Sequence, residues 1–271
     1  MSTHRPTSSR LGDDPAPGSV TAPAAARGPR LLDERNGTTA PMAAAWIRAG
    51  LMGLPLYGLL TLWAAREPQP NPAEEYEAWS RFVTAPEYVL THVLGSGLGL
   101  IFVIFGTFAL GAYLLRTRAA RLALWAMTVA VFGQCLFLFF TGVSAFGAPL
   151  EGQAYLAGMN LDELPTSTAD DAQALVMLAA ILVGFVGNVL LGIAMWRSDT
   201  LTVWPGVLWI LAALLMYPFG IILGALTTGA TPPTVLVGAG LVTISGAWVV
   251  WRARREPAAA DGRVSAGQHA S

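Results

Sequence analysis

Five polar side chains lie deep inside long apolar stretches of the sequence, which makes them the first candidates for chemistry. They are Thr107, Gln134, Asn188, Thr243 and Ser245. At a rise of about 1.5 Å per helical residue, most of them fall at similar depths, so the sequence allows a single polar cluster. Polar groups inside a membrane either line a path for a solute or form hydrogen bonds between helices. We favour the hydrogen bonds and keep the solute path as the alternative.

His92 and Ser96 form a second candidate site, close to the outer end of an apolar stretch. They are four positions apart, so they share one face of a helix. An imidazole there is able to relay protons or bind a ligand. The alternative, which we favour, is a structural hydrogen bond to a neighbouring helix or a lipid headgroup. His4 and His269 belong to the terminal segments, which excludes a bis-histidine haem within one subunit, and no cofactor is predicted.

Two prolines inside apolar stretches, Pro55 and Pro218, predict kinked helices. Proline lacks the N–H that a helix needs and its ring pushes against the preceding turn. Transporters place such interruptions at their binding sites, although proline is also common in membrane helices generally.

The motifs of familiar enzymes are missing from the sequence. We find no Walker A loop, no GxGxxG after a strand, no HExxH, no GxSxG and no pair of carboxylates inside an apolar stretch. The acidic loops lack the spacing of an EF-hand, so no metal site is predicted. The single cysteine, Cys135, excludes an intrachain disulfide, and its mid-stretch position predicts a buried, unreactive thiol. The sequence therefore predicts a protein that is not an enzyme.

The elements that must position these residues are set by composition. The chain has 271 residues, of which 54% are hydrophobic and only 12% are charged, whereas soluble domains carry about 25% charged residues. Six apolar stretches have the length of about 20 residues needed to cross a bilayer as a helix. They are 43–65, 88–115, 122–147, 172–196, 203–226 and 232–251. The predicted fold is an all-α, polytopic membrane bundle of six transmembrane helices, occupying residues 43–252.

The two terminal segments, 1–42 and 253–271, are rich in Ala, Pro, Gly, Ser and Thr. Such segments bury too little apolar surface to offset the entropy of ordering them. We therefore predict disordered tails on both sides of the bundle.

Arginine placement predicts the orientation. All 16 basic residues are arginine, and only Arg66 and Arg81 fall on the side opposite the two termini. Because cytoplasmic loops are enriched in basic residues, both termini are predicted to be cytoplasmic. The arginine-only usage, with abundant Ala, Gly and Pro, indicates a high-GC bacterium, so the predicted location is a bacterial plasma membrane.

The outer loops carry signals of local structure. Asn71 as an N-cap and Pro72 in the first turn predict a short helix near 72–84, with Tyr76 and Trp79 on an apolar face at the outer membrane interface. A further helical turn is expected around 153–156. Small residues at four-residue spacing, such as Gly184 and Asn188, predict close helix packing within the chain.

Function is less constrained than fold. A net charge of -1 provides no basic field for nucleic acid, so none is expected as a partner. The preferred prediction is a non-enzymatic accessory or sensory membrane subunit. The alternative is a small-solute transporter or permease that uses the polar cluster. The expected partners are the lipid bilayer and either another membrane protein or a second copy of the chain.

Overall fold

The computed structural model describes residues 42–160, 168–227 and 232–255, and every regular element in these ranges is a helix. All of these residues belong to one compact unit, Met42–Ser271. The predicted tails lie outside the described residues, apart from Met42 and residues 253–255, which are helical.

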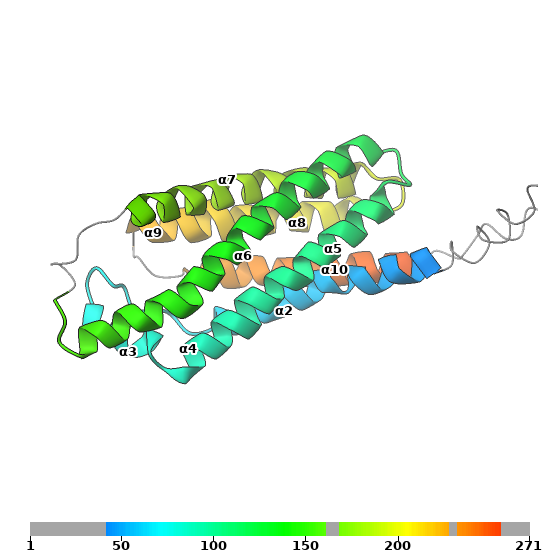
Figure 1. Cartoon of the computed structure of the whole chain (residues 1–271). Helices are drawn as coiled ribbons and strands as arrows, with labels where there is room; N and C mark the ends of the chain where they lie inside the picture. The colour runs from blue at the N-terminus through cyan, green and yellow to red at the C-terminus, as the bar shows by residue number, and fades with distance from the viewer. Residues whose placement is uncertain (1–41, 161–167, 228–231, 256–271) are drawn as a thin grey trace, which may run out of the picture. The chain divides into compact units, whose positions relative to one another are not determined.

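Six long apolar helices are present in the described part of the chain, which confirms the all-helical prediction there. Each is long and apolar enough to cross a membrane, and their bounds are Met42–Ala64, Pro86–Leu114, Ala120–Leu156, Asp171–Arg197, Val203–Ile222 and Pro233–Arg255. The first span contains α2 (Gly53–Ala64), and the second is formed by α4 (Pro86–Leu90), the π-helix η1 (Thr91–Gly97) and α5 (Leu98–Leu114) (Figure 1). The third span is α6 (Ala120–Leu156), and the fourth belongs to α7 (Thr168–Arg197). The fifth is α8 (Val203–Met216) with the π-helix η3 (Tyr217–Ile222), followed by α9 (Leu223–Thr227), and the sixth is α10 (Pro233–Arg255). A short helix, α3 (Tyr76–Val83), precedes α4.

The spans form a closed ring in chain order. α2 packs against α5, α5 against α6, α6 against α7, α7 against α8, α8 against α10, and α10 returns to α2 (Figure 1). The first and sixth spans also meet at the end where one begins and the other finishes, because an Arg254 Nη group donates to the Met52 sulfur at 3.5 Å. The core shared by the helices of the ring includes Leu54, Leu191 and Trp209, which are fully buried or nearly so.

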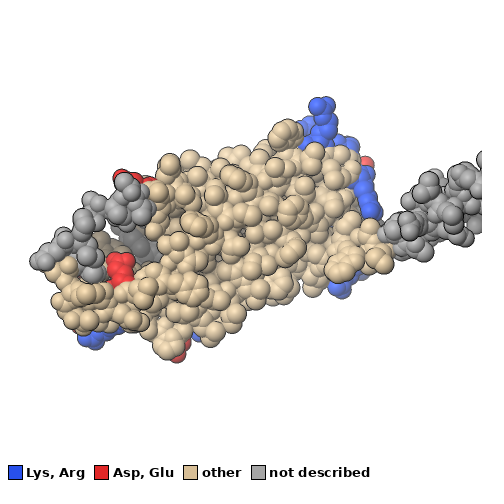
Figure 2. Space-filling model, in the orientation of Figure 1, with Lys and Arg blue, Asp and Glu red and all other residues tan. Residues whose placement is uncertain are grey.

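Large apolar side chains also cover the outside of the ring. Phe105, Phe132 and Phe139 are 62%, 59% and 63% exposed. Contiguous apolar surface of this kind is rare on soluble monomers. Figure 2 shows the middle of the unit almost free of charged side chains, with arginines and carboxylates gathered at its two ends. The six apolar helices indicate a membrane protein.

The two ends differ in charge. One end, which we call the basic end, carries most described arginines: Arg48, Arg116, Arg118, Arg121, Arg197, Arg252, Arg254 and Arg255. The opposite end, the acidic end, carries most described carboxylates: Glu67, Glu74, Glu75, Glu77, Glu87, Glu151 and Asp171. Arg66 and Arg81 at the acidic end, and Asp199 at the basic end, are the described exceptions. Asp162 and Glu163, which precede α7 in the sequence, lie outside the described residues.

The predicted outer helix is shorter than expected. Residues 72–74 form a turn in which the Asn71 Oδ1 accepts from the Ala73 N–H at 3.0 Å, and the helix proper begins at Tyr76. Its apolar face was expected at a membrane interface, and this expectation is wrong. Trp79 and Val83 are instead buried in a small cluster of their own, where α3 packs against α6.

α6 continues to Leu156 through Pro149, well past the predicted end at residue 147. Proline costs one backbone hydrogen bond, but the extension gains a partner in α3. A Cβ on Gly152 would lie 2.7 Å from the Val83 side chain, and the Tyr76 hydroxyl donates to Glu151 Oε1 at 2.6 Å. The helical turn expected around 153–156 is therefore the last turn of α6.

Glycines set the distance between α6 and α7. A Cβ built on Gly133 would lie only 2.5 Å from the backbone of Gly184, so the two helices touch through their main chains. Gly192 faces Gly206 and Ile210 of α8 in the same way. The small residues of α7 are therefore occupied by packing within the chain.

This contact predicts a position-specific loss of stability. Gly133→Leu should lower the free energy of unfolding by about 1–3 kcal/mol, because the added side chain must separate two backbones. Gly142→Leu is the matched control on α6, since no atom lies within 4 Å of a Cβ built there. Thermal unfolding of the purified protein in detergent measures both. Equal midpoints for the two variants would contradict the α6–α7 contact.

Candidate functional site

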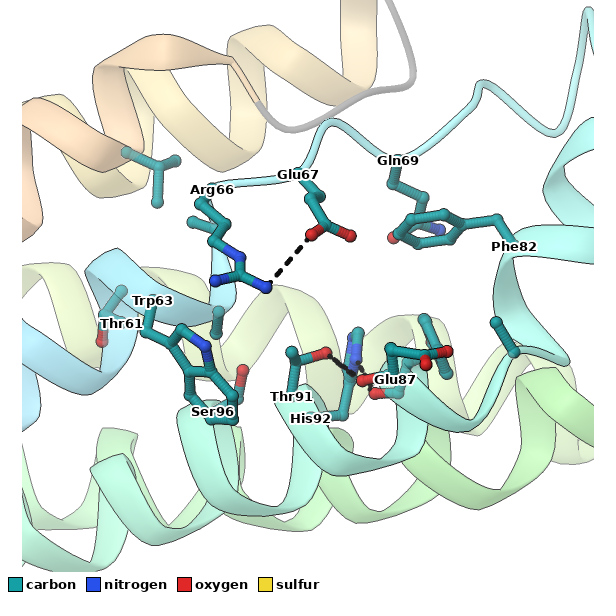
Figure 3. A pocket seen from close by; sticks show the side chains of 15 residues that line it. Thr61, Trp63, Arg66, Glu67, Gln69, Phe82, Glu87, Thr91, His92 and Ser96 are labelled. Carbon is teal, nitrogen blue, oxygen red and sulfur yellow. Dashed lines mark hydrogen bonds and ion pairs between the residues drawn. The ribbon is translucent and has the colours of Figure 1, made fainter.

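A cavity of about 410 Å³ lies at the acidic end, beside the end of the first span. We call it the acidic-end cavity. Residues 61–69 form one wall and the α4–η1 segment forms the facing wall, with Phe82 of α3 at the side (Figure 3). Its lining residues are Thr61, Trp63, Ala64, Ala65, Arg66, Glu67, Gln69, Phe82, Ala85, Glu87, Tyr88, Thr91, His92, Ser96 and Val235. Both His92 and Ser96, the second predicted site, therefore face this space.

His92 is held by two contacts with Tyr88. The His92 Nδ1 lies 2.9 Å from the Tyr88 carbonyl oxygen, and the two rings stack with centroids 3.9 Å apart. A carbonyl only accepts hydrogen bonds, so Nδ1 must carry the proton. In the neutral imidazole, Nε2 is then left as an acceptor in the cavity wall.

Charge in the acidic-end cavity is net negative. Arg66 Nη2 pairs with Glu67 Oε1 at 3.2 Å, and both side chains are more than half exposed. Glu87 makes no ion pair within the described ranges, so its carboxylate is the uncompensated charge. A carboxylate, an acceptor nitrogen and aromatic rings together suit an ammonium group, which donates hydrogen bonds and is attracted to aromatic faces.

A π-helix positions His92. η1 spans Thr91–Gly97, and single π-helical turns are rare and frequent at functional sites. Here the turn carries His92 and Ser96, while Gly95 between them lies against Ala64 of the first span. The sequence gives no signal for this π-helix, and of the cavity-lining residues it indicated only His92 and Ser96 as a site.

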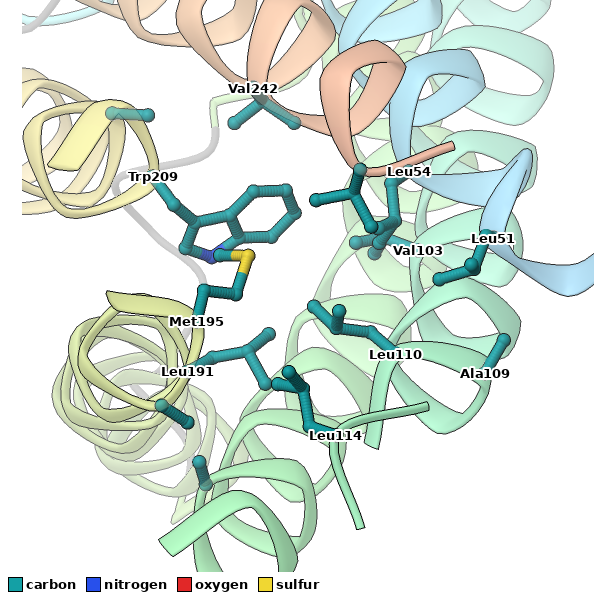
Figure 4. Packing of buried hydrophobic residues seen from close by; sticks show 14 of the residues in the cluster. Leu51, Leu54, Val103, Ala109, Leu110, Leu114, Leu191, Met195, Trp209 and Val242 are labelled. Atoms are coloured by element: carbon teal, nitrogen blue, oxygen red, sulfur yellow. The ribbon is translucent and has the colours of Figure 1, made fainter. Parts of the chain in front are cut away.

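The other predicted site, formed by the polar residues of the bundle interior, is centred on Asn188. Trp209 of α8 points into the core beside Met195 and Val242 (Figure 4), and its Nε1 donates to Asn188 Oδ1 at 3.0 Å. Asn188 Nδ2 donates to the Tyr217 hydroxyl at 3.2 Å and to the Gly184 carbonyl at 2.8 Å. One amide thus joins α7, α8 and η3.

Gln134 lies next to this group. Its Nε2 donates to Thr107 Oγ1 at 3.1 Å, which joins α6 to α5. Its Oε1 is buried and has no partner among the described residues. Gln134, Asn188, Tyr217 and Tyr57 line a void of about 10 Å³, which is about the space that one water molecule needs.

The other two polar candidates lie apart from this group. Ser245 Oγ donates to the Pro205 carbonyl at 2.8 Å, which ties α10 to the first turn of α8. Thr243 Oγ1 donates to the Ala239 carbonyl of its own helix at 2.9 Å. The structure therefore brings Gln134 and Asn188 to one small void and connects Thr107 to it through Gln134, while Thr243 and Ser245 neither line the void nor bond to these residues.

The two prolines lie at irregular points of their helices. The first span makes a one-residue turn at Met52, three residues before Pro55. Pro218 lies within η3, the π-helix that carries Tyr217 to Asn188.

Cys135 is not buried, contrary to expectation. It lies exposed on the outward face of α6, because the neighbouring Gln134 takes the inward position. Among the described residues, no three His, Cys, Asp or Glu side chains gather as metal ligands would.

The interior site predicts unequal costs for two amide substitutions. Asn188→Leu leaves the buried Trp209 Nε1 without an acceptor, which costs about 1–3 kcal/mol. Gln134→Leu removes one interhelical hydrogen bond, worth about 0.6 kcal/mol in membranes, together with an oxygen that has no protein partner. Thermal unfolding in detergent should therefore show the larger loss for Asn188→Leu. Thr128→Val, which removes an exposed hydroxyl on α6, is the control, and a larger loss for Gln134→Leu would contradict the hydrogen-bond assignment.

Comparison of the chain with family models, with curated proteins and with solved structures gives no match. The function is therefore argued from the geometry of the two sites and from the charge of the two ends.

Proposed function

We propose that the chain is a non-enzymatic sensory or accessory protein of the bacterial plasma membrane, which binds a small organic cation in the acidic-end cavity. The observation that carries this proposal is the combination of Glu87, the acceptor nitrogen of His92 and the rings of Trp63, Phe82 and Tyr88 around one space of about 410 Å³. Pockets of this size hold small molecules, and a few polar groups among aromatic walls define what they accept.

The membrane orientation that goes with this proposal has both termini in the cytoplasm. Most described arginines are at the basic end, where both chain ends of the bundle lie, and the positive-inside rule places that end in the cytoplasm. The acidic-end cavity then faces the outside of the cell. Its surrounding carboxylates raise the local concentration of cations.

A cation in this cavity would touch two spans at once. Trp63 belongs to the end of the first span and His92 to the second, and Gly95 of η1 lies against Ala64 between them. Binding therefore bears on the packing of two helices, which is what a sensory protein needs in order to report on a ligand. A partner membrane protein or a second copy of the chain would receive this change.

Transport has less support from the geometry. The void beside Gln134 and Asn188 has a volume of about 10 Å³ and shares no lining residue with the acidic-end cavity. The buried amides hydrogen-bond to neighbouring helices, as expected for packing groups.

Cysteine labelling tests the orientation. In a Cys135→Ala background, Glu77→Cys at the acidic end should react with a membrane-impermeant maleimide on intact cells. Asp199→Cys at the basic end should react only after the membrane is permeabilised. Both positions are exposed, so a reversed pattern would contradict the proposed orientation.

Ligand-dependent thermal stability tests the cavity. 2-Phenylethylamine, a protonated aromatic amine at neutral pH, should raise the midpoint of unfolding by a few degrees at saturating concentration. Glu87→Gln and His92→Leu should each remove most of this increase, because the first removes the negative charge that attracts the ammonium group and the second removes an acceptor for it.

Two controls separate binding from general effects. 2-Phenylethanol has the same ring without the charge and should leave the midpoint unchanged. Glu74→Gln removes an exposed carboxylate of the same end that does not line the cavity, and it should retain the response. An equal response from Glu87→Gln and the unsubstituted protein would exclude Glu87 as the cation ligand.

A further inference from the structure

A second cavity lies at the basic end, in the angle between the α5–α6 turn and the end of α7. It measures about 580 Å³ and is lined by Arg118, Ala119, Arg121, Leu122, Trp196 and Arg197. We call it the basic-end cavity. Three of its six lining residues are arginines and none is acidic, so the positive charge of its walls favours the binding of an anion.

The backbone around these arginines is fixed by buried hydroxyls. Thr117 Oγ1 accepts from the Ala119 N–H at 3.1 Å, and Ser198 Oγ accepts from the Leu201 N–H at 3.1 Å. Arg118 Nε donates to the Arg197 carbonyl at 2.9 Å, which ties the two turns together. The backbone that carries the arginines, together with the Arg118 side chain, is therefore held in place before any ligand arrives, which lowers the entropic cost of binding.

The guanidinium charges are not neutralised among the described residues, although Arg118 uses its Nε for the Arg197 carbonyl. None of the three arginines forms an ion pair within residues 42–160, 168–227 and 232–255. Asp199, the acid nearest to them along the chain, is exposed and likewise unpaired in these ranges. Guanidinium groups bind phosphate oxygens through paired hydrogen bonds.

An apolar track leads from this cavity along the outward face of α6. Trp125 follows Arg121 by one helical turn, and Phe132 and Phe139 follow at seven-residue intervals on the same face. They are 68%, 59% and 63% exposed. Trp196 at the cavity rim is also half exposed, and tryptophans typically mark the level of the lipid headgroups.

We propose that the basic-end cavity binds the phosphodiester headgroup of an anionic phospholipid, whose acyl chains lie along the α6 track. Basic pockets between transmembrane helices at the cytoplasmic face suit such headgroups. A soluble phosphate ester shares the anionic chemistry, but it would make no use of the apolar track. The lipid is therefore the occupant that accounts for both features.

Binding of defined lipids to the detergent-purified chain tests this proposal. Phosphatidylglycerol and its dimeric form, diphosphatidylglycerol, should bind more tightly than phosphatidylcholine, as measured by native mass spectrometry. The Arg118→Gln/Arg121→Gln/Arg197→Gln variant should bind the anionic lipids roughly 100-fold more weakly, as three lost basic side chains predict. The double variant Arg121→Gln/Arg197→Gln, which keeps the Arg118 side chain, should show a smaller loss in the same direction and covers any folding defect of the triple variant.

A matched variant separates this cavity from general surface charge. Arg116→Gln/Arg254→Gln/Arg255→Gln removes the same charge from the same end but does not touch the cavity lining. It should keep its affinity for the anionic lipids. Equal losses in the two triple variants would overturn the site in favour of diffuse attraction, and so would equal affinity for phosphatidylcholine. Glycerol phosphate that binds as tightly as the lipids would assign the cavity to a soluble anion and overturn the lipid.

Discussion

The absence of water from a bilayer interior is the constraint on which the rest of this structure depends. A polar group buried there must find its hydrogen-bond partner inside the protein. The backbone meets this demand by forming helices, and the side chains meet it across helices. Asn188 engages Trp209 and Tyr217, and Ser245 engages the Pro205 carbonyl. Gln134 Oε1 is a place in the described core where no protein partner meets the demand, and the void of about 10 Å³ beside it has about the space that one water molecule needs.

The same constraint removes the usual force that holds helices together. Lipid chains are as apolar as leucine, so burying leucine between helices gains little and close backbone contact must replace it. Gly133 against Gly184 and Gly192 against Gly206 supply that contact. Where the helices meet so closely, the void beside Gln134 and Asn188 is only about 10 Å³, which is too small for a substrate. The larger cavities with charged walls lie at the two ends of the bundle.

The same physics explains which parts of this structure the sequence predicted and which parts it did not. The six helices were predictable because the lengths of the apolar stretches and their lack of charge reflect the bilayer directly. The pairing of residues across helices was not predictable, since the contact of Trp209 with Asn188 depends on which faces α7 and α8 turn toward each other. Cys135 was misplaced because a helix that is apolar all round gives no sign of which face turns inward. α3 was misplaced for a related reason: an amphipathic pattern shows that one face is buried, and it does not distinguish a membrane surface from α6. The acidic-end cavity, finally, depends on η1, and no regular spacing of residues in the sequence indicates a π-helix.

The second span connects the two ends in a way that bears on sensing. It begins at the acidic-end cavity with Glu87 and His92, and it runs into the turn that carries Arg118 at the basic end. A Cβ on Gly106 of α5 would lie 2.9 Å from the Leu54 backbone, so the second span packs directly against the first. A displacement that begins at η1 is either carried along α5 or absorbed within the π-helix itself. In the first case it reaches the hydrogen bond between Arg118 and the Arg197 carbonyl, where the two arginine-bearing turns meet. The second span thus leads from the acidic-end cavity to the turn that lines the basic-end cavity, and under the proposals above it would couple a bound cation to a bound lipid without a path through the core.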